Sequence, residues 1–153
     1  MSGVIRRGML IAWIFEEGEM KYYRPISLIM AVTFALTGLL FLFFANGVLV
    51  FFNQVARLTG LKFSPVAGVD FYLILAAAYM YLVTLLAVMM FRHPGNYWFP
   101  LLLTNAKFAS SLLSFSFFIL HQPYPVYLTN ALVDGLIGAL VLYFYRQVKK
   151  GQP

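Results

Sequence analysis

The chain contains no cysteine and little charge, and each shortage excludes a class of protein. Without cysteine it can form no disulfide, thiolate metal site, iron–sulfur cluster or cysteine nucleophile. Charged residues make up 10% of the 153 positions and hydrophobic residues 62%, whereas ordinary soluble domains carry about 25% charged residues. A soluble fold of this length cannot bury so much apolar surface, because small domains keep a large fraction of their surface exposed. The composition therefore predicts an integral membrane protein.

The sequence motifs of common enzymes are missing as well. There is no nucleophile elbow, no zinc-ligand spacing, no phosphate-binding glycine loop and no dinucleotide fingerprint. We therefore expect a protein that is not an enzyme and that has no metal site. The net charge of +6 does not indicate nucleic-acid binding, because the basic residues lie at the ends of apolar runs and not in one patch.

Four apolar runs are long enough to cross a hydrocarbon core as helices, which takes about 20 residues each. They predict transmembrane helices over 26–52, 71–91, 98–120 and 126–145. Barrel strands would be about half as long and would alternate in polarity. The short connections "RHPGNYW" and "HQPYP" predict tight hairpins between antiparallel neighbours. The expected fold is an all-α integral membrane protein, a single membrane domain with four helices in an antiparallel up-down bundle.

Two further segments are expected to form short helices on the membrane surface. In the N-terminal segment, 1–25, an apolar stretch too short to span is followed by the acidic "EEGE", which indicates an interfacial helix anchored by Trp13. Pro25 is expected to open the first span. Between the first two spans, "FFNQVARLTGL" leads into an outer loop over 53–70, and its helical periodicity indicates a second interfacial helix.

The basic residues predict the orientation of the chain. Eight of them lie on one face of the membrane and two on the other, with Lys107 inside it. The eight are Arg6, Arg7, Lys21, Arg24, Arg92, Arg146, Lys149 and Lys150, and the two are Arg57 and Lys62. The excess of positive charge on cytoplasmic segments predicts both termini in the cytoplasm, including the tail 146–153. The predicted location is the bacterial inner membrane, which the chain would cross several times.

Polar residues inside the third and fourth spans form the candidate site. They are Lys107, Ser110, Ser111, Ser114, Asn130 and Asp134. Helical periodicity places the three serines on one stripe with Lys107, and it places Asn130 and Asp134 on one face of the next helix. In an antiparallel hairpin the levels of Lys107 and Asp134 differ by roughly 7 Å, which a lysine side chain nearly covers. Because a lone charge is costly in hydrocarbon, we predict a direct or water-bridged Lys107–Asp134 ion pair.

Two functions are open for this polar group. In the leading hypothesis it fixes helix register in a non-catalytic subunit that packs against and stabilises a larger membrane complex for energy transduction or transport. The partners would then be the lipid bilayer and other integral membrane subunits. The alternative is a small carrier, or a lipid- or small-molecule-binding membrane protein, that uses Lys107, Asp134 and Asn130 around an internal cavity.

The two histidines and two deep tyrosines complete the candidates. Histidine commonly ligates haem, but His93 and His121 flank opposite ends of the third predicted span and cannot ligate one haem together. No cofactor is therefore predicted for the chain, and a haem or pigment shared with a partner subunit stays open. Tyr79 and Tyr81 lie deep in the second span, where each hydroxyl is expected to bond to a neighbouring helix.

Overall fold

The chain is all-helical in the computed structural model, which describes residues 3–66 and 70–150 and the side chains of 22–66 and 72–150. The helices are α1 (Gly3–Phe43), α2 (Ala45–Thr59), α3 (Asp70–Arg92), α4 (Trp98–Leu120) and α5 (Pro125–Lys150). All but α2 contain a stretch long and apolar enough to span a membrane, and consecutive spans run antiparallel. The predicted fold class is confirmed.

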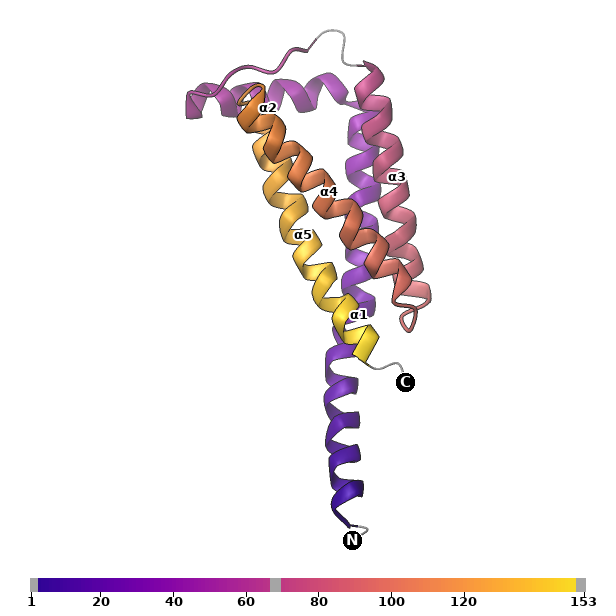
Figure 1. Cartoon of the computed structure of the whole chain (residues 1–153). Coiled ribbons are helices and arrows are strands. Elements are labelled where there is room, and N and C mark those ends of the chain that lie inside the picture. The colour runs from indigo at the N-terminus through magenta and orange to yellow at the C-terminus, as the bar shows by residue number, and fades with distance from the viewer. Residues whose placement is uncertain (1–2, 67–69, 151–153) are drawn as a thin grey trace.

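The four spans pack as two antiparallel pairs (Figure 1). The first pair is α1 with α3, and the second pair is α4 with α5. Contacts within each pair are extensive, whereas between the pairs α3 meets α4 over a shorter region and α1 touches α5 only slightly. The pairs converge at the end of the bundle where α5 ends and diverge toward α2, which crosses the wider end (Figure 1).

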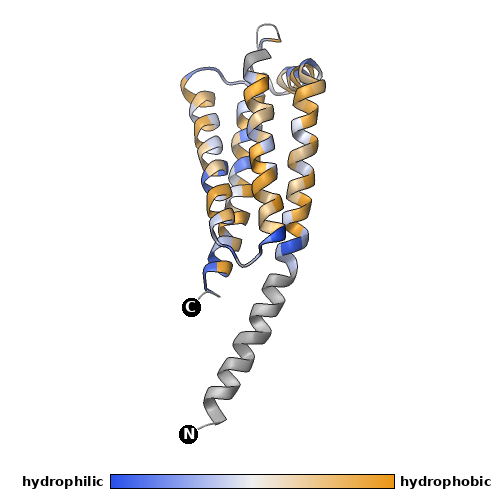
Figure 2. Cartoon of the chain, turned by 90° about the vertical axis from the view of Figure 1, so that its right-hand side faces the viewer, coloured by the Kyte–Doolittle hydropathy of each residue, from blue (hydrophilic) through white to orange (hydrophobic). Residues whose placement is uncertain are grey.

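A small core joins the two pairs, and lipid must cover the remaining apolar surface. Tyr23 and Phe34 of α1, Met90 of α3, Leu103 of α4 and Phe144 of α5 are all buried. The rings of Tyr23 and Phe144 lie edge to face with their centroids 5.2 Å apart. At most 22% of the residues in the apolar stretch of each span are buried within the protein. Figure 2 shows that hydrophobic residues predominate along the spans, and many of the large ones are exposed, which suits contact with a lipid bilayer.

The first span is shorter than the apolar run suggests. α1 ends at Phe43, and residues 45–52, which the sequence assigned to this span, form the first half of α2. At Phe44 the backbone leaves the helical region, with φ −130° and ψ 32°, and the chain turns to run across the bundle (Figure 1). Val48 and Leu49 of α2 are half-buried and line a space inside the bundle. The apolar run therefore extends beyond the first span, because the face of α2 with Val48 and Leu49 packs over the end of the bundle.

The N-terminal segment also differs from its expectation. α1 begins at Gly3 and continues through Pro25, so residues 3–25 belong to the long helix, form no separate short one, and Pro25 does not open the first span. A proline removes one backbone hydrogen bond and usually kinks or ends a helix, but at this position the helix continues. The expected anchoring role of Trp13 lies outside the described side chains.

α2 is fixed to the residues that follow it by its C-terminal cap and by Asn53. Gly60 ends the helix with φ +71°, a left-handed conformation that glycine adopts without a Cβ clash, and its N–H donates to the Ala56 carbonyl. The Asn53 side chain then donates from Nδ2 to the Ser64 carbonyl at 3.0 Å and accepts from the Ser64 N–H at 2.7 Å. These two bonds hold residues 61–66, here called the return segment, alongside α2.

Replacing Asn53 with alanine should release the return segment from α2. Both hydrogen bonds to Ser64 would be lost, and each such bond typically contributes about 0.5–1.5 kcal/mol. We expect the Ser64 amide to exchange its hydrogen at least tenfold faster, measured by hydrogen exchange with mass spectrometry. The matched control is Gln54→Ala, because Gln54 is exposed on the neighbouring position of α2. Equal protection of the Ser64 amide in both variants would contradict this role of Asn53.

Candidate functional site

Lys107 and Asp134 form a direct ion pair inside the bundle. Lys107 Nζ donates to Asp134 Oδ1 at 2.8 Å, and the two residues are 2% and 4% exposed. The hairpin between α4 and α5 places them opposite each other, with Pro125 as the first residue of α5, where its missing N–H costs no helical bond. The predicted pair is confirmed, in its direct form.

All four spans meet at the Lys107 ammonium. Its Nζ lies 4.5 Å from the ring centroid of Phe34 in α1 and 5.1 Å from that of Tyr79 in α3, within the range of cation–π attraction. The carboxylate of Asp134 comes from α5, and Asp134 is the only acidic residue among the described side chains. Lys107 therefore connects the first pair of helices to the second.

The buried pair is incompletely hydrogen-bonded. The second carboxylate oxygen of Asp134, Oδ2, has no hydrogen-bond partner, and neither has the buried hydroxyl of Thr104, one turn before Lys107. Buried polar atoms without partners cost free energy. The arrangement therefore holds the helices together at a cost, and an apolar pair of similar volume would avoid that cost.

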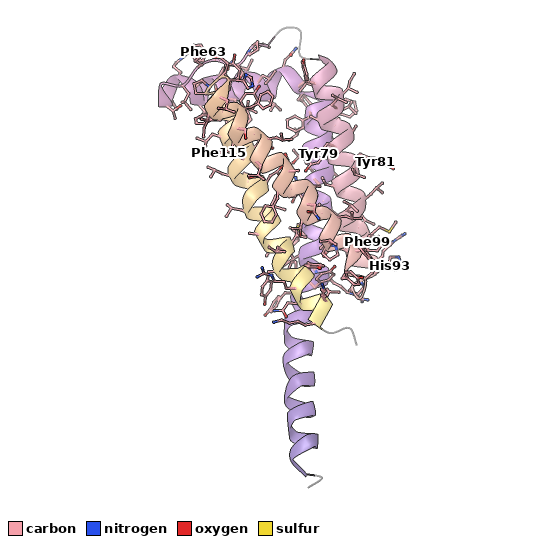
Figure 3. All side chains as sticks on the ribbon, in the orientation of Figure 1. Phe63, Tyr79, Tyr81, His93, Phe99 and Phe115 are labelled. Atoms are coloured by element: carbon pink, nitrogen blue, oxygen red, sulfur yellow. The ribbon has the colours of Figure 1, made fainter. Side chains whose placement is uncertain are left out.

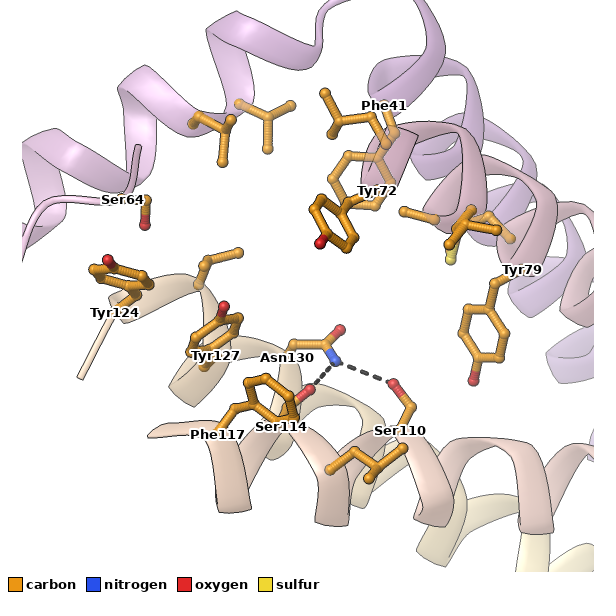
Figure 4. A pocket seen from close by; sticks show the side chains of 18 of the residues that line it. Phe41, Ser64, Tyr72, Tyr79, Ser110, Ser114, Phe117, Tyr124, Tyr127 and Asn130 are labelled. Carbon is orange, nitrogen blue, oxygen red and sulfur yellow. Dashed lines mark hydrogen bonds between the residues drawn. The ribbon is translucent and has the colours of Figure 1, made fainter. Parts of the chain in front are cut away.

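The other predicted polar residues divide into two groups. Ser111 donates to the Ala131 carbonyl of α5 at 2.7 Å, so it belongs to the packing between α4 and α5. Asn130 Nδ2 instead donates to Ser110 Oγ at 3.1 Å and to Ser114 Oγ at 2.7 Å. We call Ser110, Ser114 and Asn130 the polar triad, which links α4 to α5 on the side that faces the first pair (Figure 4).

A cavity of about 910 Å³ lies between the two pairs, on the bundle side of α2 (Figure 4). The wall from α1, α2 and α3 is mostly apolar and consists of Phe41, Val48, Leu49, Tyr72, Leu73, Leu75, Ala76, Tyr79 and Met80. The opposite wall carries the polar triad with Leu113, Phe117, Tyr124, Val126 and Tyr127, and the return segment adds Ser64 and Pro65. The cavity is therefore amphipathic, and the polar triad is on its α4–α5 side.

Tyr79 separates the cavity from the ion pair. Its ring lines the cavity and also contacts the Lys107 ammonium, and its hydroxyl donates to the Ala106 carbonyl of α4 at 3.0 Å. This is the interhelical bond expected for Tyr79. Lys107 and Asp134 do not line the cavity, so of the three residues that the carrier hypothesis placed around it only Asn130 is there. Tyr81 points away from the bundle and is 67% exposed (Figure 3).

The histidines lie at opposite ends of α4, as expected from the sequence. His93 is in the connection before α4, with its ring centroid 6.1 Å from that of Phe99 (Figure 3). His121 follows the last residue of α4 and contacts the ring of Phe117, with centroids 4.7 Å apart. Both are exposed. In the described part of the chain, no three His, Asp or Glu side chains gather closely enough to hold a metal ion.

Sequence reasoning missed most of the cavity lining. Tyr72, Tyr124 and Tyr127 line it, but aromatic residues near the ends of spans also anchor helices at the membrane interface. Their positions in the sequence therefore did not distinguish cavity-lining tyrosines from interfacial anchors. Ser110 and Ser114 were singled out only as polar neighbours of Lys107 on its helix. Asn130 was placed beside an internal cavity in the carrier hypothesis, and the cavity does include it.

Comparisons with other proteins return nothing for this chain. No protein-family model, no curated protein and no solved structure matches it. A function must therefore be argued from the geometry of the site itself.

Proposed function

We propose that this protein binds a lipid-like amphiphile in the cavity between its two helix pairs. The observation that carries the proposal is the amphipathic cavity of about 910 Å³. Binding pockets for small molecules are typically about 300–1,000 Å³ and mainly apolar, with a few polar groups that orient the ligand. The cavity described above has this combination, and the polar triad supplies the orienting groups.

The position of the cavity favours a ligand that comes from the bilayer. Tyr79 and Ser110 lie nine and ten residues from the α2-side ends of α3 and α4, which is about 15 Å along a helix and half of a hydrocarbon core of about 30 Å. Two of the lining leucines, Leu75 and Leu113, are 51% and 62% exposed. The cavity is therefore accessible at membrane depth, where lipids are the available molecules.

The orientation of the protein is part of the proposal. The distribution of basic residues supports cytoplasmic termini in a bacterial inner membrane. In that orientation α2 lies on the outer surface, and the cavity occupies the outer half of the bilayer. The ligand would then be an outer-leaflet lipid or a hydrophobic molecule dissolved in that leaflet.

The accessory-subunit hypothesis stays a prediction. It rested on short loops and largely apolar spans, and neither feature distinguishes a subunit of a complex from a protein that acts alone. The ion pair fits either function, because it lies behind Tyr79 and joins the four spans. The cavity is the feature that favours binding, and the proposal includes no catalytic step.

Filling the cavity tests the proposed function. The double variant Leu49→Trp/Ala76→Trp places two indole rings among the lining residues of α2 and α3. We expect protein purified in a mild detergent to retain at least tenfold less extractable amphiphile than the wild type, measured by quantitative mass spectrometry of an organic extract.

The control for this variant is Val50→Trp/Ala78→Trp. Val50 and Ala78 are exposed on the same two helices and do not line the cavity, so retention should match the wild type. If the wild type retains no more amphiphile than the cavity-filled variant, the protein does not use this cavity for binding and the proposal is wrong.

A further inference from the structure

We infer that the cavity selects neutral lipids whose headgroup carries a hydroxyl group, such as a monoacylglycerol or a long-chain alcohol, over charged lipids. This inference rests on the proposed function, because it names the ligand class of the same cavity. It follows from three features: the charge of the lining, the geometry of the polar triad and the depth at which the triad lies.

The described lining residues carry no formal charge. Their polar side chains are those of serine, tyrosine and asparagine only. The nearest buried charges, Lys107 and Asp134, are paired with each other at 2.8 Å behind Tyr79. An ionised headgroup that entered the cavity would lose water and find no opposite charge, which costs far more than burying a neutral hydroxyl. The lining therefore disfavours anionic and cationic lipids alike.

The polar triad presents an acceptor to the cavity. Asn130 Nδ2 uses its two hydrogens on Ser110 Oγ and Ser114 Oγ, so the amide oxygen Oδ1 is left to accept a bond. In Figure 4 the amide nitrogen faces the two serines and the oxygen faces the open space. The Ser114 hydroxyl also has a proton to donate. A ligand hydroxyl, which both donates and accepts, complements this arrangement.

The triad lies below the level of ordinary phospholipid headgroups. Asn130 is five residues into α5 and Ser110 ten residues from the end of α4, so they lie about 7 and 15 Å along their helices from the α2-side ends. A headgroup at this depth must be small and must leave the interfacial water. The facing wall offers Phe41, Leu73 and Met80 to an acyl chain. The bound lipid therefore has its hydroxyl against α4 and α5 and its chain against α1 and α3.

The headgroup preference is tested with lipids that share one chain. The wild-type protein is titrated in phosphatidylcholine nanodiscs with monooleoylglycerol, oleyl sulfate or oleyltrimethylammonium, and the bound fraction is read by native mass spectrometry. We expect monooleoylglycerol to bind at least tenfold more tightly than either charged lipid. Binding of a charged lipid with equal or higher affinity would overturn the inference while leaving the proposed function intact. Saturable binding of none of the three would overturn both.

The role of the triad is tested with Asn130→Leu. This variant removes the acceptor and should weaken binding of monooleoylglycerol about tenfold, while binding of methyl oleate, which has no hydroxyl, should be unchanged. The matched control is Asn105→Leu, because Asn105 is exposed outside the cavity and donates only to the Leu101 carbonyl of its own helix. An equal loss for both lipids, or no loss for either, would overturn the role of Asn130. If Asn130→Leu does not fold, Ser114→Ala is measured against the same criteria.

Discussion

Replacing Asp134 with leucine should lower the free energy of unfolding by about 3–5 kcal/mol, because it leaves the Lys107 ammonium buried without a counter-charge. Lys107 is 2% exposed and has no other described acidic side chain near it. The rings of Phe34 and Tyr79 contribute cation–π attraction, but they do not replace the carboxylate. The measurement is reversible unfolding in detergent micelles, followed by circular dichroism and by size-exclusion chromatography of the folded fraction.

The double variant Lys107→Met/Asp134→Leu separates the charge from the packing. Replacing a buried ion pair by apolar side chains of similar volume is often neutral or stabilising, and the unpartnered Oδ2 of Asp134 adds to the cost of the native pair. We therefore expect the double variant to regain at least the stability of the wild type. If Asp134→Leu alone is as stable as the wild type, the ammonium does not depend on this carboxylate and the account of the ion pair is wrong.

The second large effect is expected at Gly138, where α5 lies close to the Phe108 ring of α4. A Cβ at Gly138 would lie 3.0 Å from Cδ1 and Cε1 of the Phe108 ring. Gly138→Leu therefore requires the two helices to separate or the ring to move. Overpacking of this kind typically costs about 1–3 kcal/mol, and here it also strains the hairpin that brings Lys107 and Asp134 together. We expect a lower unfolding midpoint in the same assay.

Gly47→Leu is the matched control, because a Cβ at Gly47 in α2 meets no atom within 4 Å. It should leave stability unchanged or raise it slightly, since glycine inside a helix costs about 0.5–1 kcal/mol relative to alanine. Phe108→Ala should partly restore Gly138→Leu by making room for the new side chain. Equal effects of the two glycine substitutions would show that the contact with Phe108 is not limiting.

The ion pair was predictable from sequence because only local geometry was needed. Helical periodicity placed Lys107 and Asp134 on definite faces, and the prolines of "HQPYP" forced a hairpin that set their depths. Because a lone charge is costly in hydrocarbon, the two side chains were expected to face each other and not the lipid. The same reasoning placed Asn130 on the face of its helix that carries Asp134.

The end of the first span and the cavity were not predictable in the same way. Residues 45–52 stay largely apolar after the span ends, although Val48 and Leu49 line the inside of the bundle and do not cross the membrane. The cavity depends on how far the two pairs diverge. That divergence is set by contacts between distant segments, such as the hydrogen bond from the Tyr79 hydroxyl of α3 to the Ala106 carbonyl of α4. The hydrophobic pattern of a sequence predicts which face of each helix is buried, but it does not predict the angle between two pairs of helices.

The convergence of four helices on one ammonium has a consequence for how the chain enters the membrane. A segment with lysine at its centre partitions into the bilayer at a cost of about 2.5–3.5 kcal/mol, and the carboxylate that offsets this cost is 27 residues further along the chain. The last two helices should therefore leave the translocon together, after the ribosome has synthesised both, as a hairpin in which Lys107 and Asp134 are already paired. Assembly would then end when that hairpin docks on the two helices already in place.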